Sequence, residues 1–112
     1  MPTVKRLVID DNRTFDFEAD HARTVIDALI ALDKVKYEEI WWDHDLGTEN
    51  GGDTIGIANY LVSKRWNLDC KMIVHTANPV GRANLVAILG RLYTVEELPF
   101  THLKDYLVKD TE

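Results

Sequence analysis

Three short apolar runs in this chain each end directly at acidic or histidine residues. The runs cover residues 7–9, 40–42 and 72–74, and they are rich in β-branched and aromatic side chains, which predicts buried strands. Parallel strands end at one edge of a sheet, and ligands bind in the crevice outside that edge. We therefore expect one pocket to contain the residues that close the three runs: Asp10, Asp11, Asp43, His44, Asp45 and His75.

The length and apolar content of the chain indicate one globular domain, and we assign residues 1–112 to it. An apolar fraction of 46% is enough for one hydrophobic core. No apolar stretch approaches the roughly 20 residues that span a bilayer, so no membrane partner is expected. The single cysteine, Cys70, permits no internal disulfide, and no secretory signal is visible. These features predict a cytoplasmic location.

The charge of the chain restricts its nucleic-acid partners. A formal net charge of −6 argues against a general surface for polyanions, and hence against duplex nucleic acid. A small phosphorylated ligand or an RNA end, held through a metal ion, remains compatible with this charge.

Apolar periodicity between the strands predicts helices, and the alternation of the two predicts an α/β sheet with crossover connections. Asp20 is expected to cap the first helix and Asn78 to cap a later one, with Pro79 in its first position and Gly90 ending it. The expected strands are 4–9, 15–19, 39–42, 71–74 and 92–95, and the expected helices are 22–32, 54–64, 79–89 and 100–108.

The adjacent carboxylates of Asp10 and Asp11 are costly to bury unless a cation neutralises them. Mg²⁺ takes a few carboxylates and keeps several waters, which suits such a pair. The alternative is a solvated strand end in which Asp11 and Asn12 form a turn.

The second segment, Asp43-His44-Asp45, places two carboxylates on one face of a strand end, with a histidine between them. A neighbouring carboxylate can prepare a histidine for proton transfer. The glycines that follow, beginning with Gly47, permit close approach of a ligand. An exposed acidic turn is the structural alternative.

The third segment places His75 at a strand end, immediately before the N-terminus of a helix. Free backbone N–H groups at such a terminus attract phosphate, and Arg82 could add a bidentate contact one turn further on. The alternatives are a core histidine and an arginine that only solvates the helix.

The three segments together resemble receiver domains of two-component signalling, and more narrowly the cyclic-phosphate processing receiver-like domains. The resemblance rests on Asp-Asp-x-Arg at 10–13, Asp-His-Asp-Leu-Gly at 43–47 and His-Thr-Ala-Asn-Pro-Val-Gly-Arg-Ala-Asn at 75–84. It implies a three-layer, flavodoxin-like α/β fold with a mostly parallel sheet of about five strands. By position, Asp43 matches the receiver phosphoacceptor, Asp10 and Asp11 the metal-binding acids, and Thr76 the receiver hydroxyl.

The chain departs from the receiver pattern in two places. Receivers carry a lysine after the fifth strand, whereas residues 92–99 contain none and offer Glu96 and Glu97 instead. This departure argues against ordinary aspartyl phosphorylation. Only 33 positions separate Asp10 from Asp43, which predicts that the first receiver helix is missing. How residues 12–20 join the sheet is left open.

The function expected from these residues is metal-dependent hydrolysis of a cyclic phosphate, on an RNA end or a cyclic nucleotide. The expected metal is Mg²⁺ or Mn²⁺, and its expected ligands are Asp10, Asp11, Asp43 and Asp45. The residues assigned to catalysis are His44, His75 and Asp43, and those assigned to the substrate are Arg13, Thr76, Asn78 and Arg82. The alternative is a non-catalytic receiver-like module that binds a phosphorylated nucleotide or a protein partner.

Overall fold

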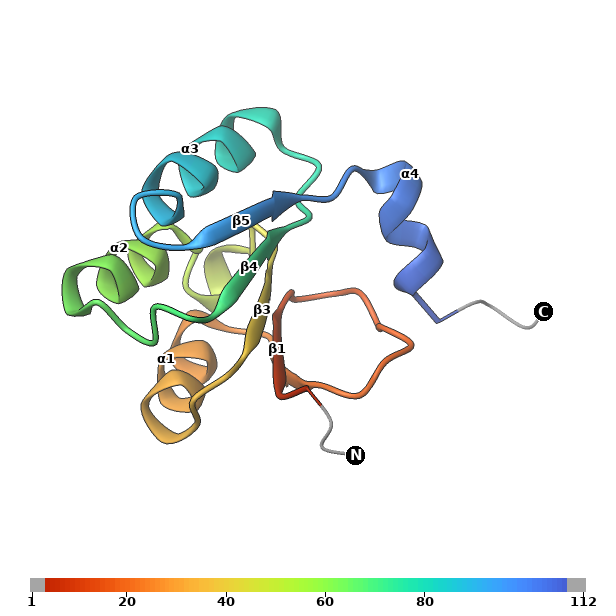
Figure 1. The fold of residues 1–112 in the computed structure, drawn as a ribbon. Helices are drawn as coiled ribbons and strands as arrows, with labels where there is room; N and C mark the ends of the chain where they lie inside the picture. Colours follow the sequence, from red (N-terminus) through yellow and green to blue (C-terminus); the bar gives the residue numbers. More distant parts are fainter. Residues whose placement is uncertain (1–3, 109–112) are drawn as a thin grey trace.

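A computed structural model describes residues 4–108 of the chain. In this range the strands are β1 (Arg6–Ile9), β2 (Asp20–Ala22), β3 (Glu39–Trp42), β4 (Lys71–Val74) and β5 (Thr94–Glu97). The helices are α1 (Val25–Lys34), α2 (Ile55–Lys64), α3 (Pro79–Leu89) and α4 (Phe100–Leu103), with short 3₁₀ helices η1 (Thr48–Asn50) and η2 (Lys104–Tyr106) (Figure 1).

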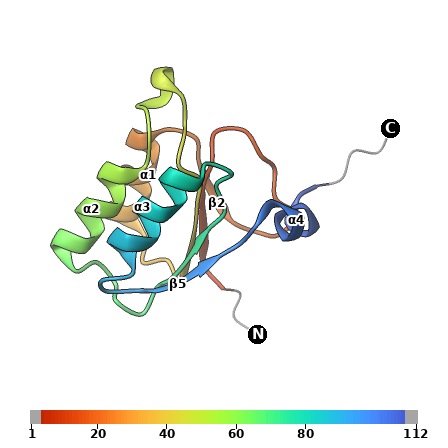
Figure 2. The ribbon, with the colours of Figure 1, turned by 90° about the horizontal axis from the view of Figure 1, so that it is seen from above.

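The five strands form one parallel sheet in the order β2-β1-β3-β4-β5. This is the order of flavodoxin-like receiver folds, so the predicted fold class is confirmed. Helices α1, α2 and α3 cover one face of the sheet (Figure 2). The segment between β1 and β2 lies on the other face together with α4, and it contains no helix. The first receiver helix is therefore absent, as predicted.

Side chains alternate between the two faces along the central strands, which explains why these strands are apolar throughout. In β3, Ile40 and Trp42 point into the larger core under the three helices. Trp41, between them, joins a smaller core on the opposite face. Phe15 and Leu103 complete that smaller core, so the β1–β2 segment and α4 cover it in place of long helices.

Two predictions for the first third of the chain are wrong. Residues 15–19 do not form a strand; Phe15 makes an isolated bridge to Leu107, and its ring is buried. The strand is Asp20–Ala22, so Asp20 is not a helix cap. The helix α1 begins later because the Thr24 side chain accepts the backbone N–H of Asp27.

The elements after α3 differ in extent from the prediction. The last strand begins at Thr94 rather than at residue 92 because the N–H groups of Leu92 and Tyr93 still bond to Leu89 at the end of α3. The expected helix 100–108 is α4 followed by η2, since the chain then turns so that Leu107 pairs with Phe15. The caps predicted at Asn78, Pro79 and Gly90 are confirmed.

None of the helices described in this structure is both long and apolar enough to span a membrane.

Candidate functional site

Three carboxylates gather at the C-terminal edge of the sheet. Asp10 follows β1, Asp43 follows β3, and one carboxylate oxygen from each of Asp10, Asp11 and Asp43 lies within 4.8 Å of the others. Asp10 and Asp43 are buried, at 0% and 8% exposure. The parallel sheet thus brings together residues 33 positions apart, as the strand-end pattern predicts. Asp45 is not a member of this group.

Asp10 is held by a dense set of hydrogen bonds. Its Oδ1 accepts the backbone N–H groups of Asn12 and Arg13, at 2.9 and 3.0 Å. Its Oδ2 lies 3.0 Å from His75 Nε2 and 3.1 Å from Arg13 Nη1. Burial raises the pKa of the Asp10 carboxyl, but the bonds from His75 and the two N–H groups outweigh it, so the net pKa lies well below its usual range. Asp10 is therefore a carboxylate.

The negative charge of Asp43 is stabilised by fewer hydrogen bonds than that of Asp10. Its Oδ1 accepts the N–H of His44 at 2.8 Å, and its Oδ2 lies 3.6 Å from Arg13 Nη1. Burial and the neighbouring Asp10 charge raise the pKa of Asp43 above its ordinary value. A bound cation would relieve this raised pKa, because it would neutralise both carboxylates at once.

The carboxylate group fits a hard divalent cation. Three carboxylate oxygens at this spacing are the donors that Mg²⁺ prefers, with room left for water. Arg13 provides the positive charge there, since one of its nitrogens contacts both Asp10 and Asp43. Residues 92–99, which include β5, contain no lysine, so the cationic group close to Asp43 is that of Arg13.

His75 is buried against Asp10. Its side chain is 0% exposed, and its ring lies against Phe15 and Trp41, with centroids 5.4 and 6.2 Å away. Because an ionised carboxylate only accepts hydrogen bonds, His75 Nε2 carries the hydrogen shared with Asp10. Its Nδ1 has no partner among the described residues. The described contacts of the His75 imidazole are thus with Asp10 and with aromatic rings.

His44 and Asp45 form a second unit beside the carboxylates. His44 Nδ1 lies 3.0 Å from Asp45 Oδ1, while His44 Nε2 is 4.0 Å from Asp53 and so makes no hydrogen bond to it. Hydrogen bonds from Asn78 and His44 lower the pKa of Asp45, which keeps it ionised. An imidazole oriented through one nitrogen with the other left open is the arrangement of a proton-transfer group.

The N-terminus of α3 is capped from within the chain. Asn78 Oδ1 accepts the N–H groups of Val80 and Gly81, both at 3.1 Å. The amide of Asn78 donates to Asp45 Oδ2 at 3.2 Å and lies 3.4 Å from His44 Nδ1. Asn78 therefore orients the His44–Asp45 pair, and the N–H groups expected to hold phosphate are already occupied.

Thr76 and Arg82 flank this cap. The Thr76 hydroxyl accepts the N–H of Asn78 at 3.1 Å and is buried. Arg82 donates to the Thr76 carbonyl at 3.4 Å and lies 3.5 Å from Glu97 Oε1, which holds it near the end of β5.

Two residues that support the site were missed in the sequence. Arg23 donates to the backbone carbonyls of Asp10 and Arg13, at 3.1 and 2.9 Å, and fixes the turn that presents both side chains. Thr54, fully buried, donates its hydroxyl to the Asp43 carbonyl at 2.7 Å. Neither residue belongs to a local motif; both act through partners ten or more residues away.

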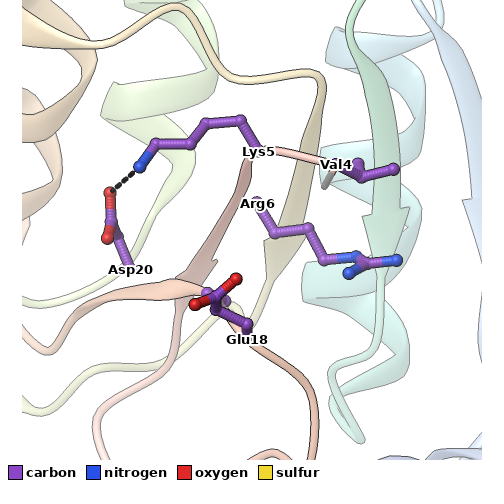
Figure 3. Close-up of a pocket in the computed structure, with 6 residues that line it drawn as sticks. Val4, Lys5, Arg6, Glu18 and Asp20 are labelled. Carbon is purple, nitrogen blue, oxygen red and sulfur yellow. Dashed lines mark ion pairs between the residues drawn. The ribbon is translucent and has the colours of Figure 1, made fainter. Parts of the chain in front are cut away.

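A separate hollow lies at the N-terminal end of β1, lined by Val4, Lys5, Arg6, Glu18, Ala19 and Asp20 (Figure 3). Lys5 and Asp20 form an ion pair across it, at 3.6 Å. It is separate from the carboxylates that follow β1 and β3, which lie at the opposite end of these strands.

The solved structures that this chain resembles include two receiver folds. One is a response regulator from Burkholderia pseudomallei whose structure holds a phosphorylated aspartic acid, a calcium ion and citrate. It is 19% identical with a TM-score of 0.63, over 96% of this chain and 68% of that one. The other is a CheY-like receiver domain protein from Methanospirillum hungatei, 15% identical with a TM-score of 0.62, over 88% and 82% of the two chains. At these identities the likeness establishes the fold alone.

Comparison with protein families identifies the chain more closely. No curated protein matches it significantly. A family model, that of the cyclic-phosphate processing receiver domain, matches residues 5–91. This range contains all three motifs and the residues that follow β1, β3 and β4. The chain therefore belongs to the cyclic-phosphate processing receiver domain family.

Proposed function

We propose that this chain hydrolyses a cyclic phosphate, on an RNA end or a cyclic nucleotide, with the help of one divalent cation. The observation that carries the proposal is a histidine, His44, that directly follows Asp43 in the chain and whose ring is oriented by Asp45, together with three carboxylates that fit a cation. A plain phosphoacceptor site needs no such histidine. The response regulator from Burkholderia pseudomallei that has a similar fold holds a calcium ion, and this supports a cation in the site proposed for this chain.

In this proposal Asp10, Asp11 and Asp43 hold the cation, Mg²⁺ or Mn²⁺. A cation bound there supplies Lewis-acid polarisation of a phosphoryl oxygen. Arg13, released from the two carboxylates that it contacts now, is placed to bind a phosphate oxygen. Asp45 acts through His44 rather than as a fourth ligand, because its oxygens contact His44 and Asn78.

The proposed proton transfer runs through His44. His44 Nε2 takes a proton from the attacking water, the water oxygen bonds to phosphorus, and one ester P–O bond of the ring breaks. The leaving oxygen takes a proton from solvent water, and the attacked phosphorus becomes a phosphomonoester on the opened ring, for an RNA end and a cyclic nucleotide alike. Asn78 and Asp45 hold the imidazole in place during this step.

The role of His75 is proposed here as orientation of Asp10, whereas the sequence suggests direct acid or base catalysis. Replacing His75 by glutamine distinguishes the two, since the glutamine amide can donate to Asp10 from a similar position but cannot exchange a proton. Retained turnover in His75→Gln together with lost turnover in His75→Phe supports orientation. Lost turnover in both, with the fold intact, supports direct catalysis.

The function is tested with a panel of 2′,3′-cyclic-phosphate RNA ends, cyclic mononucleotides and cyclic dinucleotides, with and without Mg²⁺ or Mn²⁺. Products are identified by ³¹P NMR. Metal-dependent ring opening that is lost in Asp43→Asn and His44→Ala supports the proposal. Tight binding without turnover, retained in Asp43→Asn, would instead support the non-catalytic module. An acid-labile adduct on Asp43 after treatment with a small phosphodonor would support an ordinary receiver.

A further inference from the structure

Gly81 lies in the first turn of α3, directly against the imidazole of His44. A Cβ added at this glycine would lie 2.3 Å from His44 Cγ and 2.6 Å from both Cδ2 and Nδ1. Real Cβ atoms do not approach other atoms so closely, so an alanine here requires the ring to move. The backbone of Gly81 is helical, and glycine is less favourable than alanine inside a helix. Space for the ring, not backbone freedom, explains the glycine.

The His44 ring is otherwise enclosed by polar groups. Asp45 and the Asn78 amide contact its Nδ1 edge, and the His44 side chain is only 12% exposed. Gly81 lies against Cγ, Cδ2 and Nδ1 of the ring. A ring displaced from α3 would lose the contacts that direct Nδ1 to Asp45, and with them the open orientation of Nε2.

We propose that Gly81 is a positioning residue for His44: the missing side chain lets the imidazole lie on the first turn of α3, where Asn78 and Asp45 orient it. The positioning follows from the geometry alone. Its consequence for turnover rests on the proposed hydrolysis of a cyclic phosphate.

A double-mutant cycle, with Tm as the measured quantity, tests the positioning without any substrate. Gly81→Ala is expected to lower Tm in the wild-type background, because the new methyl group collides with the ring. In the His44→Ala background the collision is gone, and the same change should raise Tm by about 3 °C through helix propensity. Equal losses in both backgrounds would overturn the proposal. If Gly81→Ala does not fold, rescue by His44→Ala supports the proposal, and failure of rescue overturns it.

Gly56 provides a matched control. It also lies in a helix, α2, but an added Cβ meets nothing within 4 Å there. Gly56→Ala should raise Tm in both backgrounds and leave the ring ¹H–¹³C signals of His44 unchanged, whereas Gly81→Ala should shift them. Unshifted His44 signals in a folded Gly81→Ala protein would refute the positioning role.

Turnover provides the link to the proposed function. With a cyclic-phosphate substrate that the wild type opens, Gly81→Ala should lower kcat at least tenfold while KM changes less than twofold, because His44 acts on the reacting water and not on binding. Unchanged kcat would refute the catalytic consequence. If the wild type opens no substrate, the proposed function fails, while the double-mutant cycle and the His44 signals still decide the positioning.

Discussion

Replacing Arg13 by glutamine should tighten the binding of Mg²⁺. Arg13 Nη1 lies 3.1 Å from Asp10 Oδ2 and 3.6 Å from Asp43 Oδ2. Its positive charge is therefore close to the two carboxylates that the cation would bind. A Mg²⁺ ion about 2.1 Å from these oxygens would lie within roughly 5 Å of the guanidinium. Even in a water-like dielectric, a double and a single positive charge at that distance repel by about 1.7 kcal/mol. This repulsion corresponds to roughly a tenfold difference in Kd.

The assay is titration calorimetry of Mg²⁺ into metal-free protein at low ionic strength, with Tm measured across the same range of Mg²⁺ concentrations. Arg13→Gln should bind about tenfold more tightly and, without metal, should melt at a lower temperature, because two adjacent carboxylates lose their counter-ion. Its Tm should therefore rise more steeply with Mg²⁺ than that of the wild type.

Arg91→Gln is the matched control, because it removes the same charge from an exposed position just after α3. It should leave the Kd for Mg²⁺ within about twofold, as expected for an exposed, screened charge. Equal or weaker Mg²⁺ binding by Arg13→Gln would refute competition between the guanidinium and the cation.

Three further outcomes are expected. Thr54→Val should lower the free energy of unfolding by about 1–2 kcal/mol in urea titrations, because the Asp43 carbonyl loses a buried donor; an unchanged midpoint would contradict this. Asn78→Asp keeps an oxygen for the α3 cap but removes the donor to Asp45, so the pKa of Asp45 should rise towards its ordinary value. Carboxyl ¹³C titrations measure this pKa, and an unchanged value would show that the Asn78 amide does not lower it. Burial raises the pKa of Cys70 from 9.0 to about 12, so above pH 9 the unfolded chain releases a proton that the folded chain keeps. Between pH 8 and pH 10 the free energy of unfolding of the wild type should thus fall by about 1.4 kcal/mol more than that of Cys70→Ala. Parallel plots of this free energy against pH for the two proteins would contradict the prediction.

Local chemistry explains the parts of the fold that could be predicted. Asn78 followed by Pro79 can cap and begin a helix wherever it stands, because the cap involves only neighbouring residues. Residues 15–19 were predicted wrongly because their alternation of apolar and acidic residues has a local period of two, whereas Phe15 is fixed by Leu107, more than ninety residues away. The late start of α1 has a long-range part and a local one, because residues 20–22 pair with β1 and Thr24 then caps the helix.

At the site too, some features follow from local sequence and others from contacts between distant segments. The gathering of Asp10, Asp11 and Asp43 was predictable, since any parallel sheet brings its strand ends to one edge. The direction in which each polar side chain points was not predictable. Asn78 and its helix terminus looked open to phosphate, but the folded chain uses the side chain to orient Asp45 and to cap α3.

Local sequence is enough to predict which residues lie at the edge of the sheet, because strand ends, caps and acidic pairs are properties of neighbouring residues. The contacts and the burial of those residues become known only from the folded chain. It buries His75 against Asp10, leaves His44 beside a glycine that makes room for it, and places Arg13 between two carboxylates. The physical reason is that burial and charge compensation depend on segments far apart in the chain, which meet only when the sheet has formed.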